Sequence, residues 1–243
     1  MTRPGVLILR SELEARRLAE VLAAKGYAPI VSPVLSIAPV AFDWPDPPLS
    51  GSVLTSANAV SPLLAHTSAA RLIDGPVWCV GTRAADQLGR LWHGAPLDIR
   101  PDGKDVHALA GRLAAERLNA PLVHFHGQQT STPLSHLLPS GPEIIDRVVY
   151  EALPVGELNG AARDALAHGK IASILHFSPR SARLAVAAII AANRRQPFQA
   201  ARHVCLSQHV ADALTEALGV RPAGGVSIAG YPDEAGLLAA LDG

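Results

Sequence analysis

Charged residues are scarce in this sequence, and the two signs balance. Only 17% of the 243 residues are charged, and 21 Lys and Arg residues offset 21 Asp and Glu residues, so the formal net charge is zero. A chain without a global positive field is not favoured to bind nucleic acid or an anionic membrane surface. An anionic ligand must therefore be held by local donors, such as the backbone N–H groups at helix starts.

Cysteine is equally scarce. The two cysteines, Cys79 and Cys205, each lie inside an apolar run, VWCV and HVCL, and neither belongs to a CxxC pair. We predict that both are buried strand residues, because cysteine is among the residue types most often buried. A metal site built from cysteine is not expected.

Long apolar runs and nucleotide-binding motifs are missing as well. No run reaches the length needed to span a bilayer, and the opening MTRPGVLILRSELE meets an acidic residue too early for a signal peptide. Neither GxGxxG nor GxxxxGK[ST] occurs, which disfavours a nucleotide enzyme. Because 49% of the residues are hydrophobic, a sizeable core can form. We expect a soluble, cytoplasmic protein of one large or two small domains.

One stretch of the chain occurs twice. Residues 52–64 read SVLTSANAVSPLL and residues 173–186 read SILHFSPRSARLAV, so an apolar run, a serine and a helical pattern follow one another in both. The pattern predicts a buried strand, a tight turn, and a helix with Ser56 or Ser178 as its N-cap. Pro179 suits the first helical position. Such turns present N–H donors to an anion, although any α/β protein also contains ordinary turns of this kind.

The rest of the chain alternates short apolar runs with helical patterns, which predicts parallel sheets with right-handed crossovers. Ser11 and Glu14 fit a capping box before the first helix, whose apolar face should include Leu13, Leu18 and Leu22. The expected strands are 6–9, 27–35, 76–80, 121–125, 144–150, 203–206 and 226–229, and 95–100 is a short strand or a loop. The two repeats, 53–64 and 172–193, each supply a further strand, turn and helix. The other expected helices are 12–25, 83–92, 105–117, 134–138, 157–168, 208–218 and 233–241.

Two connectors divide these elements. The proline-rich stretch 37–49 excludes a helix, and a second connector follows Tyr150. The middle block supplies about five strands, and the two chain ends together supply another five. We therefore predict two flavodoxin-like, three-layer α/β lobes with parallel sheets, joined by a two-stranded hinge. The predicted boundaries are 1–37 plus 154–243 for a discontinuous lobe, 41–149 for an inserted lobe, and linkers at about 38–40 and 150–153.

Several segments resemble, in their order along the chain, those of the uroporphyrinogen-III synthase family. The segments are VLILR, LTSANAV, VWCVGTRAADQL, VVYEALP and HFSPRSA. The resemblance implies two lobes with an active site in the cleft between them, and no metal or organic cofactor. It also implies a cyclising hydro-lyase that closes hydroxymethylbilane with inversion of ring D through a spiro intermediate. This reaction belongs to tetrapyrrole biosynthesis, which leads to haem, sirohaem, cobalamin and chlorophyll.

The resemblance and the turns together give the candidate site residues. Tyr150 matches the family's linker tyrosine and is the expected proton donor to the leaving hydroxyl, the alternative being an aromatic that packs under the linker. Arg10 and Arg180 could each meet a substrate carboxylate, the alternatives being a surface salt bridge and a solvated first-turn residue. The expected substrate-binding residues are Arg10, Ser56, Ala57, Asn58, Gly81, Thr82, Gly127, Gln128, Ser178, Pro179, Arg180, Ser181, Ser207 and Gln208.

Departures from the family pattern leave some contacts open. Ala84, Ser207 and Val210 stand where the family often has Thr, Gly and Thr, although Thr82 lies near the first of them. The hydroxyl contacts at those turns, the backbone contacts and the level of activity are therefore left open. We expect a monomer that binds hydroxymethylbilane and transiently meets hydroxymethylbilane synthase. The alternative is a non-catalytic, two-lobed anion-binding or sensor protein derived from this fold.

Three histidines lie in or next to the apolar runs of predicted strands. His124 and His126 alternate along a strand and should share a side, as a metal pair or, more simply, as a satisfied polar edge. His176 lies inside an apolar strand and should be a hydrogen-bonded core residue.

Overall fold

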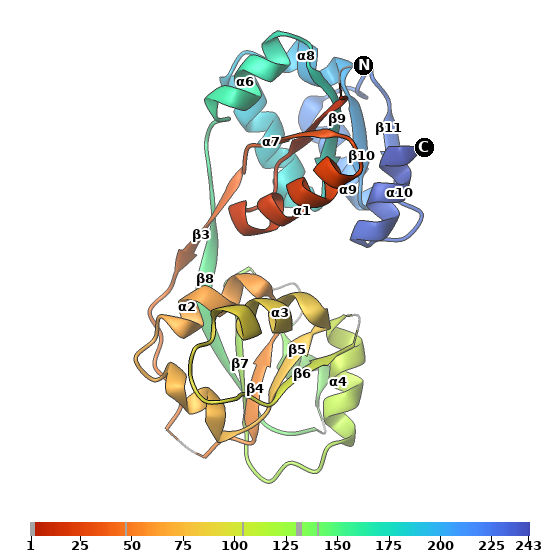
Figure 1. The fold of residues 1–243 in the computed structure, drawn as a ribbon. Coiled ribbons are helices and arrows are strands. Elements are labelled where there is room, and N and C mark those ends of the chain that lie inside the picture. The colour runs from red at the N-terminus through yellow and green to blue at the C-terminus, as the bar shows by residue number, and fades with distance from the viewer. Residues whose placement is uncertain (1–2, 47, 104, 130–132, 140) are drawn as a thin grey trace. The chain divides into compact units, whose positions relative to one another are not determined.

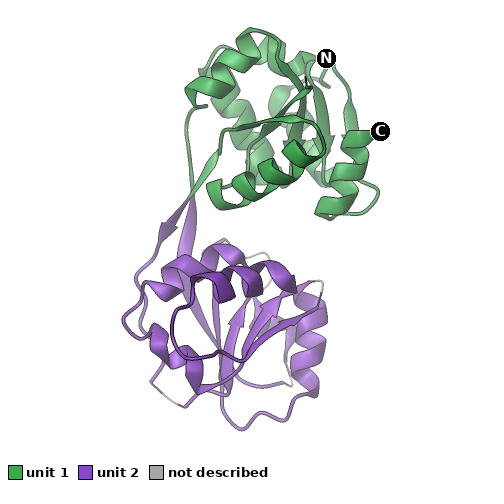
Figure 2. Cartoon of the chain, in the orientation of Figure 1, with its two compact units in different colours: residues 1–36, 153–243 green, residues 37–152 purple. Residues whose placement is uncertain are grey.

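The chain divides into two compact units in a computed structural model, which describes residues 3–46, 48–103, 105–129, 133–139 and 141–243. Unit 1 consists of residues 1–36 and 153–243, and unit 2 of residues 37–152 (Figures 1 and 2). The prediction of two α/β lobes, the first one discontinuous in sequence, is confirmed. Among the helices of the described ranges, none is long and apolar enough to cross a membrane.

Unit 1 is built on a five-stranded parallel sheet with the order β11-β10-β9-β1-β2. Its strands are β1 (Gly5–Ile8), β2 (Ala28–Val31), β9 (Ile171–His176), β10 (Arg202–Cys205) and β11 (Val226–Ile228). Its helices are α1 (Glu12–Ala24), α6 (Gly160–Ala167), α7 (Pro179–Ala191), α8 (Arg195–Ala200), α9 (Gln208–Leu218) and α10 (Glu234–Asp242).

The apolar strands of unit 1 are covered on both faces. Val6 and Ile8 pack with α1 and α10 in one core, and Leu7 packs with α6, α7 and α9 in the other (Figure 1). Because successive strand residues point to opposite faces, a strand buried on both sides is expected to be mainly apolar, with any buried polar side chain hydrogen-bonded. This explains why the run VLIL contains no polar residue.

Unit 2 is built on a six-stranded sheet with the order β3-β8-β7-β4-β5-β6. Its strands are β3 (Leu35–Pro39), β4 (Gly51–Leu54), β5 (Val77–Val80), β6 (Ile99–Asp102), β7 (Leu122–Gly127) and β8 (Ile144–Pro154). Its helices are α2 (Val60–Leu64), α3 (Gly81–Leu91), α4 (Val106–Ala115) and α5 (Leu134–Leu137), with short 3₁₀ turns at Ala57–Ala59 and Ala69–Asp74. One core cluster joins the sheet to α2 and α3, and another joins it to α4 and α5.

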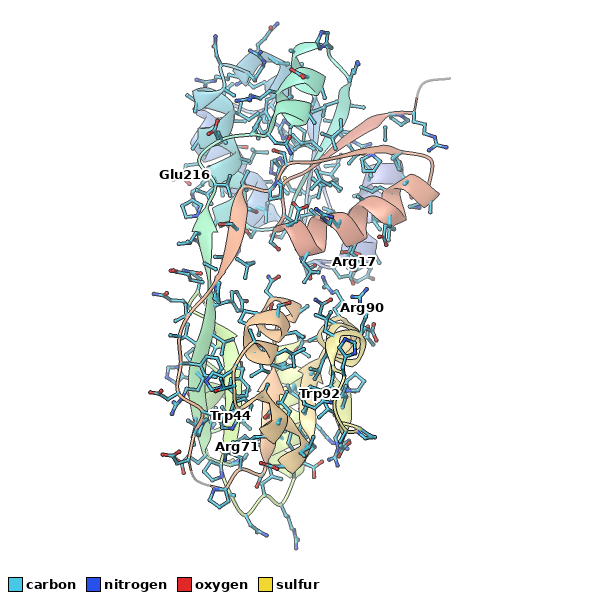
Figure 3. All side chains as sticks on the ribbon, turned by 60° about the vertical axis from the view of Figure 1, so that its left-hand side comes forward. Arg17, Trp44, Arg71, Arg90, Trp92 and Glu216 are labelled. Carbon is cyan, nitrogen blue, oxygen red and sulfur yellow. The ribbon has the colours of Figure 1, made fainter. Side chains whose placement is uncertain are left out.

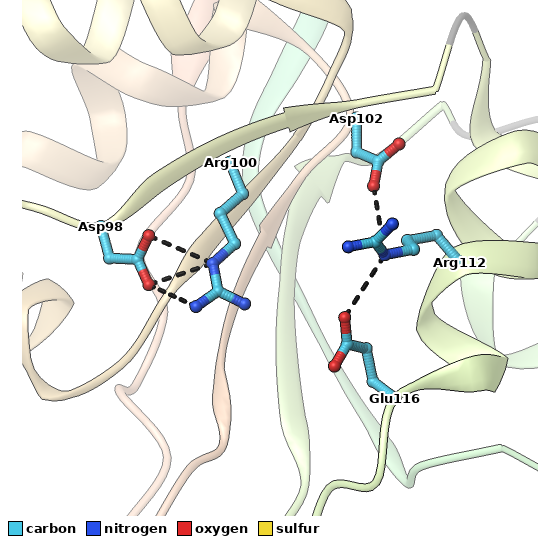
Figure 4. Close-up of polar contacts among 5 residues, drawn as sticks. All are labelled: Asp98, Arg100, Asp102, Arg112 and Glu116. Carbon is cyan, nitrogen blue, oxygen red and sulfur yellow. Dashed lines mark hydrogen bonds and ion pairs between the residues drawn. The ribbon is translucent and has the colours of Figure 1, made fainter.

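Charged side chains lie along and beside β6, one of the two edge strands of this sheet. Arg100 pairs with Asp98 at 2.6 Å, and Arg112 of α4 lies 3.6 Å from Asp102 and 3.3 Å from Glu116 (Figure 4). These exposed pairs contribute little to stability. A charged edge does oppose pairing with a strand of another molecule, which is a common protection of edge strands.

The two connections between the units pair with each other. Val40 N donates to Val149 O at 3.0 Å, and Val155 N donates to Val34 O at 2.9 Å, so β3 and β8 run antiparallel. The predicted single strand 27–35 is wrong, since β2 and β3 belong to different sheets. The prediction that a strand ends at Tyr150 is also wrong, because β8 continues to Pro154.

The start of α1 differs from the prediction. Ser11 is the N-cap by position, but its side chain makes no cap hydrogen bond, and Glu14 pairs with Arg10 at 2.8 Å. The capping box is therefore absent from this described helix. Leu13 is 37% exposed while Glu14 is buried, because the face that packs on the sheet runs through Glu14, Ala15 and Leu18.

Candidate functional site

Within unit 2, the sheet topology brings three of the predicted turns to one edge. Strands β7, β4 and β5 are neighbours and run parallel, so their carboxyl ends lie at the same edge of the sheet. The turns that follow them contain Ser56-Ala57-Asn58, Gly81-Thr82 and Gly127-Gln128. In open α/β sheets this edge is where ligands bind.

Unit 1 repeats the arrangement. Strands β10, β9 and β1 are parallel neighbours, and their carboxyl ends lead to Ser207-Gln208, to Ser178-Pro179-Arg180-Ser181 and to Arg10. Every predicted site residue therefore lies at or next to the carboxyl edge of the sheet in its own unit.

The twin serines are N-caps, as predicted. Ser56 Oγ accepts from Asn58 N at 3.2 Å, and Ser178 Oγ accepts from Ser181 N at 3.1 Å. The backbones that follow differ, because a 3₁₀ turn comes after Ser56 whereas α7 begins directly with Pro179. Ser178 Oγ also lies 2.8 Å from the hydroxyl oxygen of the buried Ser181, which adds a further hydrogen bond within this turn.

Some of the predicted backbone donors already have acceptors inside the protein. Gly81 N donates to Gly103 O at 3.0 Å, and Gln128 N donates to Tyr150 O at 2.9 Å. Ser207 differs from the other two serines: it is the N-cap of α9 by position, yet its side chain makes no cap hydrogen bond within the described chain. The first N–H groups of a helix have no acceptor inside that helix, so Ala57 and Ser207 are better placed than Gly81 and Gln128 to bind an anion.

Tyr150 lies across Gly127. A Cβ atom at Gly127 would come within 2.4 Å of the tyrosine Cζ and 2.7 Å of its hydroxyl oxygen, so only glycine fits beneath the ring. The ring is half-buried and packs against the core cluster that includes Phe125 and Val149. Its position on β8 places the phenol beside the turn after β7, among the candidate donors of unit 2.

Arg10 is held among carboxylates. It lies 2.8 Å from Glu14 Oε2 and 3.4 Å from Glu234 Oε2, and its guanidinium lies 4.2 Å from the ring centre of Phe177. Arg17 also pairs with Glu234. The salt-bridge alternative is thus present, and an incoming anion would compete with two glutamates for the same guanidinium.

A polar cluster lies beneath the carboxyl edge of unit 2. The buried His124 has its Nδ1 2.8 Å from Asp146 Oδ1 and its Nε2 3.0 Å from Thr55 Oγ1. Burial lowers the pKa of His124, and the bond to Asp146 only partly offsets that. For Asp146, burial raises the pKa, but the two histidines outweigh it and the pKa is lowered overall. His126 shares this side, and the three residues are the described group whose atoms could hold a metal ion.

Other buried polar groups are structural. His176 Nε2 lies 2.9 Å from His203 Nδ1, and His203 Nε2 lies 2.9 Å from Phe198 O, which confirms a hydrogen-bonded core histidine. Cys79 and Cys205 are fully buried, as predicted, and burial raises the pKa of each thiol to about 12. Such thiols are inert at neutral pH.

A cavity in unit 2 lies away from the predicted turns, whereas one in unit 1 is lined by a residue of such a turn. In unit 2 a cavity of about 270 Å³ lies at the amino end of β4, where Arg71 sits near the ring of Trp44 (Figure 3). This is the edge opposite the Ser56 turn. In unit 1 an open hollow of about 430 Å³ lies between α9 and β11, and Gln208 is among its lining residues.

Known families and structures were compared with this chain. The family described as uroporphyrinogen-III synthase HemD matches residues 16–224. The structure of uroporphyrinogen-III synthetase from Helicobacter pylori is 16% identical and aligns over 99% of both chains with a TM-score of 0.61. A mutant uroporphyrinogen III synthase from the extremely thermophilic bacterium Thermus thermophilus is 17% identical over 98% of this chain and 96% of its own, with a TM-score of 0.49. No curated protein matches the sequence.

The family match and the fold agree with each other. The matched region includes both serine-capped turns and the strands that carry them. The chain belongs to the uroporphyrinogen-III synthase family.

Proposed function

We propose that the chain is a cyclising hydro-lyase that closes hydroxymethylbilane to uroporphyrinogen III with inversion of ring D. The observation that carries the proposal is the family match over residues 16–224. The two matched serine turns at carboxyl edges add to it, because a tetrapyrrole with many carboxylates needs many anion donors and this chain has few charged residues. The alternative of a non-catalytic binding protein gains no support from the comparisons.

The proposed reaction needs an acid and a fixed conformer. The C–O bond of the hydroxymethyl group breaks, and the oxygen leaves as water after protonation, which gives an azafulvene. The substituted α-carbon of ring D attacks the exocyclic carbon to form a spiro intermediate. That intermediate fragments, ring D recombines through its other α-carbon, and the proton on that carbon is lost. Holding the contorted chain is an orientation effect, which can account for much of a rate enhancement.

Carboxylate binding is assigned to the turns of both units. We assign the primary contacts to the Ser56-Ala57-Asn58 and Ser178-Pro179-Arg180 turns, with Ser207 adding a hydroxyl. Arg10 and Arg180 supply positive charge. Arg180 lies near the start of α7, where the positive end of the helix dipole repels a guanidinium unless an anion is close. Thr82, Gln128 and Gln208 stay in the assignment as side-chain donors.

Tyr150 is assigned the role of acid. A phenol is mostly protonated at neutral pH and can donate to the departing hydroxyl. Its place over Gly127, beside the turn after β7, supports this assignment. We further expect a monomer that receives the unstable bilane directly from hydroxymethylbilane synthase.

The test is to supply hydroxymethylbilane and resolve the uroporphyrin isomers after oxidation. The expected product is the type III isomer, formed faster than spontaneous closure. If the type I isomer alone forms, at the rate seen without protein, the synthase proposal is wrong and the binding-protein alternative takes its place.

A further inference from the structure

Three metal-ligand side chains converge on one face of the sheet in unit 2. His124 and His126 lie two residues apart on β7 and so share a face, and Asp146 of β8 is the register partner of His124. Asp146 Oδ1 lies 2.8 Å from His124 Nδ1 and 3.6 Å from His126 Nε2. One ligand atom of each residue lies within 4.8 Å of the other two.

The remaining polar atom of each of these side chains, the one that points away from the cluster, is hydrogen-bonded to the protein. The second nitrogen of His124 lies 3.0 Å from Thr55 Oγ1, and that of His126 lies 2.9 Å from the carbonyl oxygen of Gly127. The second oxygen of the aspartate accepts from Ser135 Oγ at 3.4 Å. Metal-binding histidines are oriented in this way, with the distant ring nitrogen bonded to a carbonyl, a hydroxyl or a carboxylate.

The hydrogen bonds fix which atoms carry protons. Because a carbonyl oxygen only accepts, the His126 nitrogen that faces Gly127 must be protonated, and Nε2 is the ring nitrogen on the side of Asp146. Because a carboxylate oxygen also only accepts, His124 Nδ1 donates its proton to Asp146 Oδ1. An ion that displaces this one proton would meet a nitrogen of each histidine and an oxygen of the aspartate within one small volume.

We propose that His124 Nδ1, His126 Nε2 and Asp146 Oδ1 bind one divalent first-row transition-metal ion of the zinc class. Two imidazoles with one carboxylate suit Zn²⁺, whereas Ca²⁺ and Mg²⁺ prefer oxygen ligands throughout. The metal replaces the proton shared by His124 and Asp146, and that proton leaves to solvent. The aspartate side chain is 34% exposed, so an ion can enter and a water can complete the coordination.

The site would tie together the ends of two strands. Thr55 directly precedes the Ser56 turn, and Gly127 lies under Tyr150, so a bound ion would stiffen the backbone on which these groups stand. The inference does not rest on the proposed reaction, because metal binding is measured without any bilane.

The test uses the full chain, stripped with EDTA and desalted, titrated with Zn²⁺ alone in a calorimeter near neutral pH. We expect one ion per chain, the release of about one proton per ion, and a higher Tm when the ion is bound. Asp146→Asn and His126→Gln should each weaken the affinity on the order of tenfold or more, since even the loss of an outer-shell partner costs that much. His107→Gln, which changes an exposed histidine of α4 in the same unit, should leave the affinity unchanged.

A second probe separates this site from adventitious surface binding. Co²⁺ bound by two imidazoles, a carboxylate and water should show the intense visible absorption of a four-coordinate ion, and Asp146→Asn should abolish it while its far-ultraviolet circular dichroism matches the unchanged chain. The proposal is overturned if no saturable binding occurs at submillimolar Zn²⁺, or if folded Asp146→Asn and His126→Gln variants bind as the unchanged chain does.

Discussion

At the scale of the residue, the role proposed for the phenol of Tyr150 is the one most directly tested by substitution. It belongs to the packing of unit 2 through its ring and stands over the one residue that leaves room for that ring, Gly127. Packing and proton donation involve different atoms of the same side chain. Substitutions can therefore separate the two roles.

Replacing Tyr150 by Phe keeps the ring and removes the proton. We expect kcat for type III closure to fall about 10²-fold, the range of general acid catalysis, with little change in Tm. Gly127→Ala should also slow the reaction, since its Cβ would displace the ring. Isomer-resolved kinetics and thermal unfolding measure both. Unchanged turnover in Tyr150→Phe would leave the tyrosine with a packing role alone.

The buried histidine pair of unit 1 makes stability depend on pH. Burial lowers the pKa of His203 from 6.5 to about 4 and that of His176 well below 6.5. Below pH 6.5 these histidines bind protons in the unfolded chain but stay neutral in the folded chain. The free energy of unfolding therefore falls as pH falls towards 4. The slope is about 1.4 kcal/mol per pH unit for each histidine.

Denaturant titrations between about pH 7 and pH 4.5 check this slope. A His203→Gln variant that folds should lose less stability across the window than the unchanged chain. His168→Gln alters an exposed histidine and should keep the full slope. Equal slopes in all three proteins would mean that the pair does not control acid stability.

At the scale of the element, the serine caps show what a local pattern can and cannot specify. Ser56, Ser178 and Ser207 follow three strands and precede three helices, yet only the first two use the hydroxyl as a cap. The position of each helix start was predictable from the sequence. Whether the hydroxyl turns inward to the backbone depends on side-chain geometry that the pattern does not contain.

This difference predicts that the same substitution affects stability at Ser178 but not at Ser207. Ser178→Ala should lower the free energy of unfolding by about 1 kcal/mol, because the cap of α7 is lost. Ser207→Ala should leave stability nearly unchanged and raise KM for the bilane, because that hydroxyl is left for the ligand. Denaturant unfolding and steady-state kinetics measure the two effects. A stability loss in Ser207→Ala as large as that in Ser178→Ala would contradict this division.

At the scale of the whole molecule, the alternation of strands and helices was the part of the fold most readable from the sequence. Apolar runs such as VLIL and VWCV require burial on both faces, and their alternation with helices predicts parallel sheets. The contact between His124 and Asp146 could not be read in the same way, because it depends on the register between β7 and β8. Asp146 was missed among the candidate residues for this reason, although the histidine pair was seen.

Each unit has hydrophobic core clusters of its own, so a core substitution in one unit should destabilise mainly that unit. Phe125 and Leu214 are both fully buried, the first in a core cluster of unit 2 and the second in a core cluster of unit 1. Phe125→Ala should cost about 3–5 kcal/mol and Leu214→Ala about 2–5 kcal/mol. Hydrogen exchange should speed up mainly in the unit that carries the change. Uniform acceleration across all 243 residues would indicate a single cooperative unit instead.

The position of β1 between β9 and β2 has a consequence for how the chain is made. When residues 1–36 leave the ribosome, β1 has β2 on one side, and its other neighbour lies more than a hundred residues downstream, at Ile171–His176. The inserted unit, residues 37–152, is by contrast contiguous and ends before β9 begins. During synthesis unit 2 can therefore fold first, while the edge of β1 that later pairs with β9 is still unpaired. A pause or a truncation between residues 152 and 171 would leave that edge exposed beside a complete unit 2, and an unpaired strand edge is a site for chaperone binding and aggregation.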